Sequence, residues 1–233
     1  MQRLELVHDW LARQFPGRPL SVAPASADAS FRRYFRITFD DGLTRIVMDA
    51  PPEHEDCRPF VHVAGLLHEA GVHAPEILAQ DLERGLLLLT DLGNTTYLDA
   101  LDASNADVLF RDALDALVKW QLASRPDALP PYDEALLRRE LNLFPDWYVA
   151  RHLGSPLTAP QQEVLEQVQA LLLQNILAQP RVFVHRDYMP RNLMVAEPNP
   201  GILDFQDAVR GPITYDIASL LRDAFISWDE AQE

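Results

Sequence analysis

The apolar residues of the first ninety positions follow two kinds of pattern, one typical of helices and one typical of strands. Apolar residues recur at helical spacing over residues 4–15 and again over 59–71, which predicts two helices. Between and after these helices the apolar runs are short and rich in β-branched or aromatic residues. Such runs predict strands at residues 31–37, 44–50, 76–80 and 86–90. The small residues of segment 23–30 predict a loop that leads into the first strand.

Helical spacing dominates the middle of the chain. The pattern covers residues 104–122, 136–153 and 158–172, and we expect a kink at Pro145. The apolar stripes of these helices are interpreted as core, including Val164, Val168, Leu171 and Leu172. Short apolar runs return at residues 182–184, 193–195 and 202–203, each next to polar residues. The chain therefore reads as a β-rich part, a helical part and a final group of short strands.

Those final strands carry a group of polar residues suited to one kind of chemistry. His185-Arg186-Asp187 follows the first run, Asn192 precedes the second, and Asp204 follows the third. Transfer of a phosphoryl group to a hydroxyl needs one carboxylate that orients the hydroxyl and accepts its proton. It also needs hard oxygen ligands that hold Mg²⁺ against the phosphates. Asp187 fits the first role, and Asn192 and Asp204 fit the second. The alternative is an acid-rich hairpin loop without chemistry.

The motif His-x-Asp-x4-Asn, followed by an Asp twelve residues later, resembles the catalytic and metal motifs of the protein-kinase-like fold. The variant is similar to the aminoglycoside phosphotransferase and choline kinase group. This resemblance implies an α+β, two-lobed fold with ATP and Mg²⁺ as cofactors. A small β-rich lobe is expected at residues 1–90 and a mostly helical lobe at 91–233. The resemblance also implies structural roles for His185 and Asp216, and further terminal helices, so that we expect the chain ending at Glu233 to be truncated.

The spacing after the motif favours a small hydroxylated substrate over a protein. Only twelve residues separate Asp204 from Asp216, which leaves no room for a peptide-docking segment. Met189 stands where kinases that modify serine or threonine in proteins place a lysine.

The resemblance also implies how a nucleotide would be bound. A hairpin loop would cover the phosphates, and an apolar strand followed by a hinge would hold the adenine. The residues expected to contact the nucleotide are Ser30, Phe31, Arg32, Arg33, Val47, Leu89, Asp91 and Leu92. The chain departs from the family at Asp49, where a lysine or arginine is usual, so we expect Arg32 or Arg33 to replace that cation. A slipped alignment, a surface ion pair of Asp49, or a plain hairpin are the alternatives.

Segment 138–148 contains groups able to bind a polyol. Carboxylate and amide groups can bind sugar hydroxyls, and an aromatic face can stack on a sugar ring. We expect substrate contacts from Glu140, Asn142, Trp147 and Arg191. The alternative for this segment is a helix with a solvated face and two buried aromatic residues.

Four stretches, SFRRYFRI, VMDAPPE, TDLG and HRDYMPRNLMV, look most like one bacterial subgroup of the family. These sugar kinases phosphorylate the anomeric hydroxyl of N-acetylmuramate and N-acetylglucosamine in cell-wall recycling. Two rival interpretations stay open, namely an aminoglycoside or choline kinase and a nucleotide-binding pseudokinase without turnover.

Composition narrows the partners. Lys and Arg number 20 against 35 Asp and Glu, a net charge of −15, which argues against nucleic acid or an anionic membrane as partner. The charge fits a cationic substrate or simply a dispersed acidic surface. The single cysteine, Cys57, excludes an intramolecular disulfide. We expect a cytoplasmic protein, because the sequence shows neither a signal segment nor a membrane-spanning run. The partners implied by the resemblance are ATP and a small amino sugar. The oligomeric state is left open.

Overall fold

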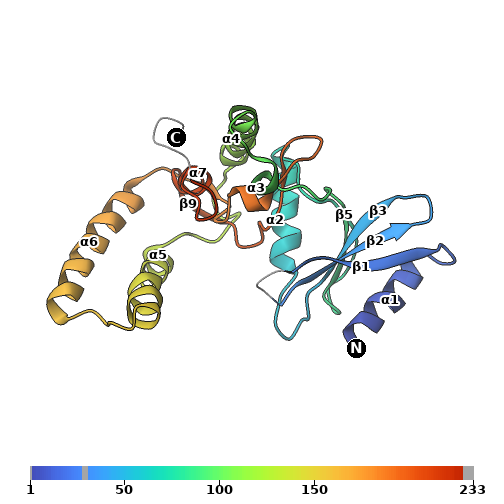
Figure 1. Ribbon diagram of the computed structural model, residues 1–233, viewed down its shortest axis with the longest axis horizontal. Helices are drawn as coiled ribbons and strands as arrows, with labels where there is room; N and C mark the ends of the chain where they lie inside the picture. Colours follow the sequence, from blue (N-terminus) through green and yellow to red (C-terminus); the bar gives the residue numbers. More distant parts are fainter. Residues whose placement is uncertain (1, 28–30, 228–233) are drawn as a thin grey trace. The chain divides into compact units, whose positions relative to one another are not determined.

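The structure is a computed structural model that describes residues 2–27 and 31–227 (Figure 1). The chain forms two compact units. Unit 1 comprises Met1–Lys119 and Met189–Asp207, and unit 2 comprises Trp120–Tyr188 and Ala208–Glu233. The expected lobes, 1–90 and 91–233, were defined by roles in binding, and that division stays a prediction. None of the described helices combines the length and apolar character needed to cross a membrane.

Unit 1 is built on an antiparallel sheet whose strands lie in the order β1-β2-β3-β5-β4. Its strands are β1 (Leu20–Ala27), β2 (Arg33–Phe39), β3 (Thr44–Asp49), β4 (Ile77–Asp81) and β5 (Leu86–Thr90). Helix α1 (Gln2–Gln14) packs on the sheet through Val7, Trp10 and Leu11, which form one buried cluster with Ile37, Phe39, Val47, Leu86 and Leu88. The helical spacing of the first fifteen residues thus predicts the face that the sheet buries. The second predicted helix is α2 (Arg58–Glu69).

One predicted element of unit 1 is wrong. Segment 23–30 was expected to be a loop, but residues up to Ala27 belong to strand β1, which pairs antiparallel with β2. The strand lies at the edge of the sheet, and its register shifts between Pro24 and Ser26. An edge strand with such an irregularity tolerates proline and small residues, because half of its backbone groups need no partner strand.

The remainder of unit 1 includes the second part of the polar motif, residues 190–204. Its elements are α3 (Tyr97–Ala100), most of α4 (Ala106–Leu122, whose last three residues fall in unit 2), η2 (Pro190–Asn192), β7 (Leu193–Met194) and β8 (Gly201–Ile202). Strands β7 and β8 pair antiparallel, and Thr96 forms an isolated bridge with Met194. These pairings attach the short strands of the motif to the segment that follows β5.

Unit 2 contains the helices of the middle of the chain and one further strand pair. Its elements are α5 (Glu134–Leu141), η1 (Phe144–His152), α6 (Ala159–Ala178), β6 (Arg181–Val184), β9 (Val209–Pro212) and α7 (Tyr215–Leu221). The helix expected over residues 136–153 is interrupted, since α5 ends at Leu141 and a π-helix begins at Phe144, with Pro145 in its first turn. Helices α5 and α6 lie side by side (Figure 1), and they share a buried cluster with β6 and β9 that includes Leu137, Leu173 and Val184.

The expected core stripe of α6 is wrong. Val164, Val168, Leu171 and Leu172 are 45% to 68% exposed, whereas Gln169 and Leu173 are buried. Gln169 donates from Nε2 to the backbone oxygen of Leu141, at 3.4 Å, so α6 turns a polar residue toward α5. Apolar residues occupy more than one side of α6, and periodicity alone therefore could not identify the side that packs.

Candidate active site

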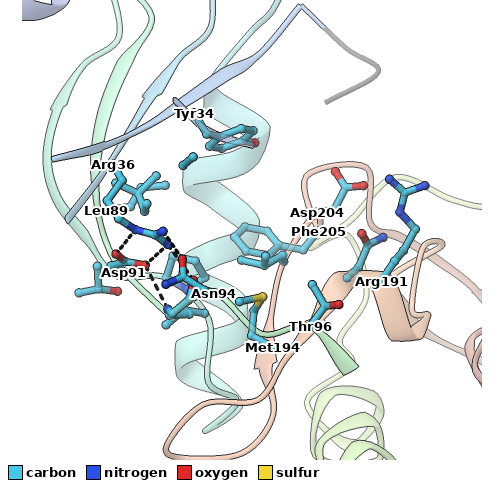
Figure 2. Close-up of a pocket in the computed structure, with 18 of the residues that line it drawn as sticks. Tyr34, Arg36, Leu89, Asp91, Asn94, Thr96, Arg191, Met194, Asp204 and Phe205 are labelled. Carbon is cyan, nitrogen blue, oxygen red and sulfur yellow. Dashed lines mark hydrogen bonds and ion pairs between the residues drawn. The ribbon is translucent and has the colours of Figure 1, made fainter. Parts of the chain in front are cut away.

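Unit 1 contains a cavity of about 300 Å³ between the sheet and the segments on either side of β7 and β8 (Figure 2). One wall is apolar and is formed by Ile46, Phe60, Leu89, Met194, Leu203 and Phe205. The lining also contains polar side chains, among them Arg191, Asn192 and Asp204. A cavity with an apolar wall and a few convergent polar groups is the usual form of a small-molecule site.

Asn192 and Asp204 reach the same cavity although twelve residues separate them. Asn192 ends the turn η2, where its N–H donates to the Met189 oxygen at 2.8 Å. Its own carbonyl accepts from the N–H of Leu203 at 2.9 Å, so the β7–β8 pairing brings the two side chains into one place. Asp204 has a φ of +62°, a conformation that non-glycine residues seldom adopt. Such a conformation persists only where the surrounding structure maintains it, and residues of this kind are concentrated at functional sites.

Carboxylate and amide oxygens are suitable donors for a hard cation. Asp204 lies beside Gln206, whose Nε2 donates to Asp204 Oδ1 at 2.9 Å. No group of three or more His, Cys, Asp or Glu side chains able to hold a metal occurs among the described residues. Asn192 and Asp204 would therefore fill only part of a coordination sphere and leave the rest to water and phosphate oxygens, an arrangement typical of Mg²⁺ bound with a nucleotide.

The two arginines expected to replace the missing cation have different surroundings. Arg32 is only 12% exposed, and its Nη2 lies 3.9 Å from Asp204 Oδ1. Arg33 forms an ion pair with Asp49, which also pairs with Arg3 of α1. Asp49 is completely buried, so its pair is not the surface ion pair that was considered as an alternative. Of the two, Arg32 is therefore the arginine that lies near Asp204, whereas Arg33 is paired with Asp49.

The hinge segment after β5 is fixed to β2 by Asp91 (Figure 2). Arg36 donates from Nε to Asp91 Oδ2 at 2.6 Å and from Nη2 to Oδ1 at 2.9 Å. Arg36 also binds the carbonyl of Gly93, at 2.8 Å, and the side chain of Asn94. Burial acts to raise the pKa of Asp91, but hydrogen bonds from Arg36 and from the Gly93 N–H outweigh it and lower that pKa. The Asp91 carboxylate is therefore committed to the hinge itself.

The other expected nucleotide contacts divide into three groups. Leu89, Asp91 and Leu92 line the cavity. Val47 instead lies in the buried cluster under α1, and its neighbour Ile46 lines the cavity, because alternate residues of β3 face opposite sides. Phe31 is 62% exposed and stacks on His54 with ring centroids 4.4 Å apart, while Ser30 lies outside the described residues.

Asp187 belongs to unit 2, where it lines an open depression with Arg139, Glu140, Leu143, Arg186 and Tyr215. The loop that carries it is fastened by Asp216. The Asp216 carboxylate accepts the N–H of His185 at 2.7 Å and of Arg186 at 3.0 Å. Burial raises the pKa of Asp216 to about 7, although both N–H groups act to lower it. His185 is buried beneath the loop, and its Nδ1 accepts the N–H of Asp187 at 3.3 Å.

The expected acceptor-binding residues are not all in one place. Glu140 lines the depression of Asp187 and accepts hydrogen bonds from Arg186 Nη2, at 2.6 Å, and from the Tyr132 hydroxyl. Asn142 caps the end of α5, and Trp147 is 56% exposed beneath the guanidinium of Arg151, 4.0 Å from its ring centre. Neither lines the depression, and the alternative of two buried aromatic residues is wrong because Tyr148 is also half-exposed. Arg191 lines the cavity of unit 1.

Among the lining residues that the sequence analysis did not assign to a site, Tyr34, Arg36 and Arg139 are polar side chains for which the sequence held a signal. Tyr34 and Arg36 line the cavity and follow Arg32 at intervals of two, so alternation along the predicted strand is the signal that could have identified them. Arg139 lines the depression of Asp187, and it lies inside segment 138–148 next to Glu140.

Comparison with known proteins finds relatives that share much of the sequence of this chain. An N-acetylmuramate/N-acetylglucosamine kinase of Pseudomonas aeruginosa is 62% identical over 91% of this chain and 62% of its own length. A kinase of the same name from Neisseria meningitidis serogroup B is 46% identical over 99% of this chain and 70% of its own. The chain thus spans less than two thirds of the Pseudomonas relative.

Structural similarity extends further than sequence similarity. The crystal structure of the aminoglycoside phosphotransferase APH(2'')-Ib, ADP-bound, superposes with a TM-score of 0.67 at 14% identity, over 97% of this chain and 78% of the other. This likeness concerns the fold alone, and it confirms the predicted protein-kinase-like class. The phosphotransferase enzyme family matches residues 21–233, which include both sites described above. The chain belongs to the phosphotransferase enzyme family.

Proposed function

We propose that the chain acts in an ATP-dependent kinase that phosphorylates a sugar, at the anomeric hydroxyl of N-acetylmuramate or N-acetylglucosamine. The observation that carries the proposal is the presentation of Asn192 and Asp204 at one cavity by the pairing of β7 with β8. Two relatives with this printed activity, at 62% and 46% identity, support the choice of acceptor.

The cavity of unit 1 is the proposed nucleotide site. Its apolar wall, which includes Ile46 and Leu89, suits the faces of an adenine ring, and the backbone of the hinge near Asp91 offers hydrogen-bonding groups to the edge. Asn192 and Asp204 would hold Mg²⁺, which neutralises phosphate charge when bound. Arg32, beside Asp204, is the proposed phosphate-binding cation in place of the usual strand lysine.

Asp187 is the proposed general base. It would orient the acceptor hydroxyl and receive its proton as the oxygen attacks the γ-phosphorus. An anomeric hydroxyl is more acidic than an ordinary alcohol, so its proton is transferred more easily to a carboxylate base. Asp216 and His185 hold the backbone on both sides of Arg186 and thereby fix where Asp187 stands.

The charge of the depression around Asp187 bears on the rival acceptors. Arg139 and Arg186 stand there with Glu140 and Asp187, so positive and negative side chains balance despite the net charge of −15 for the whole chain. Aminoglycosides and choline are cations, and a site for them should carry an acidic excess. A balanced site favours an uncharged or acidic sugar. The presence of Asp187, Asn192 and Asp204 together favours turnover over a pseudokinase role.

An ATP-consumption assay over four acceptor classes tests the proposal. N-acetylglucosamine, N-acetylmuramate, a set of aminoglycosides and choline are each supplied with Mg²⁺ and ATP. We expect turnover with the two amino sugars only. Turnover with aminoglycosides or choline alone would overturn the acceptor, and nucleotide binding without turnover on any acceptor would support the scaffold role. The same panel is run on a protein extended to the length of the Pseudomonas relative.

A further inference from the structure

The depression around Asp187 contains two arginines in different states. Arg186 is engaged, because its Nη2 lies 2.6 Å from Glu140 Oε1 and its guanidinium lies 5.9 Å from the ring centre of Tyr132. Arg139 is exposed at the rim of the same depression. Within residues 2–27 and 31–227, no carboxylate lies within ion-pair distance of the Arg139 guanidinium. One positive charge of the depression is thus available to a ligand.

The neighbouring Arg138 differs from Arg139 in both its partner and its position. Arg138 donates from Nε to Glu134 Oε1 at 2.7 Å, one helical turn earlier. Consecutive helical residues point about 100° apart, so Arg138 and Arg139 leave α5 in different directions. Arg138 does not line the depression, whereas Arg139 and Glu140 do.

A guanidinium with open donor positions is suited to a carboxylate, which it can bind through two parallel N–H···O bonds. N-acetylmuramate differs from N-acetylglucosamine by a lactyl ether whose carboxylate is ionised at neutral pH. We infer that Arg139 binds this carboxylate and so gives the site its preference for the acidic sugar over the neutral one. This inference rests on the proposed function, and it names Arg139 as a specificity-determining residue.

Electrostatics in the depression support the need for such a cation. An anionic acceptor must come close to Asp187 and Glu140, and both carboxylates repel it. Arg186 offsets the charge of Glu140 through their ion pair. The acceptor's own charge then needs a further cation, and Arg139 supplies it from the rim. A neutral acceptor has no such need, so the two sugars should depend on Arg139 to different degrees.

The test compares three variants with three acceptors. Arg139→Gln and Arg139→Ala remove the charge, and Arg138→Ala is the matched control on the same helix. The acceptors are N-acetylmuramate, its methyl ester and N-acetylglucosamine. Loss of a charged hydrogen bond should lower kcat/KM for N-acetylmuramate by about 10-fold to 100-fold. The ester and N-acetylglucosamine should change by less than about 3-fold, and the Arg138 variant should resemble the parent with every acceptor.

A binding measurement separates failure of this inference from failure of the proposed function. Calorimetry follows N-acetylmuramate and its methyl ester binding to the parent and to Arg139→Gln without ATP. We expect the parent to prefer the acid and the variant to bind both alike. Equal losses for both sugars, or a parent that binds the ester as tightly as the acid, would overturn the role of Arg139. Absence of turnover in a parent that still prefers the acid would instead count against the kinase activity.

Discussion

Replacement of Asp49 by Asn should destabilise unit 1, because Asp49 is a buried charge shared by two arginines. Its carboxylate accepts from Arg3 Nε at 3.1 Å and also pairs with the Nη2 atoms of Arg3 and Arg33. The carboxylate is completely buried, whereas the side chains of Arg3 and Arg33 are 26% and 47% exposed. The pair joins α1 to β2 and β3, so its loss loosens the attachment of the helix to the sheet.

The magnitude follows from the number of contacts and their exposure. A hydrogen bond to a charged group contributes about 1.5–3 kcal/mol, and three such contacts reach Asp49. Both arginines can turn to water in the variant, so the full sum is not lost, and we expect Asp49→Asn to cost about 2–4 kcal/mol. The double variant Arg3→Met/Arg33→Met leaves the buried carboxylate without a partner and should cost about 3–5 kcal/mol. Replacing all three residues by apolar ones should recover much of that loss.

Urea unfolding followed by circular dichroism measures these differences as shifts in midpoint at an unchanged slope. Asp41→Asn is the matched control, since Asp41 pairs with Arg18 at 2.6 Å but its side chain is 57% exposed. The control should leave the midpoint where it is. The reasoning is refuted if Asp49→Asn unfolds at the parent's midpoint, or if the double variant is as stable as the parent.

Three further predictions concern the sites. Asp204→Ala should remove the Mg²⁺ dependence of ADP affinity measured by calorimetry, and an unchanged dependence would argue against Asp204 as a metal ligand. Arg32→Ala should weaken ADP binding about 10-fold or more while Arg33→Ala mainly lowers stability, and equal effects on affinity would exclude the assignment. Asp216→Asn should flatten the pH dependence of stability between about 4 and 7. In the parent, burial raises the pKa of Asp216 to about 7, so the folded state binds more protons than the unfolded state over this pH range. Stability therefore falls as pH rises, by at most about 1.4 kcal/mol per pH unit. A variant whose stability has the same pH slope as the parent would contradict this.

The sequence predicts local structure where one pattern dominates. Helix α1, strand β3 and the break near Pro145 follow from periodicity and from proline chemistry. The pair of arginines shows how far such rules reach. Alternation along a strand predicts that only one of them faces the cavity. The other, Arg33, pairs with Asp49, and the same carboxylate also pairs with Arg3, 46 residues away in the chain. No local pattern predicts a contact between residues so far apart in the chain.

The errors have a common physical origin, because the sequence shows a pattern but not which side of it is covered. Val47 and Ile46 are both apolar, and the packing of α1 decides that Val47 is core and Ile46 lines the cavity. Helix α6 has apolar residues around much of its circumference, so the side that meets α5 could not be identified. Strand β1 lacks a strong pattern of its own and forms because β2 pairs with it.

Phosphorus NMR of the reaction product tests the central proposal most directly. The chain is incubated with ATP, Mg²⁺ and N-acetylglucosamine, in parallel with its Asp187→Asn variant. We predict a product phosphorylated at the anomeric carbon, and a loss of rate of about 10²- to 10⁴-fold in the variant, because a positioned base contributes this much. A 6-phosphate product, or a variant whose rate stays within a few-fold of the parent, would contradict the account.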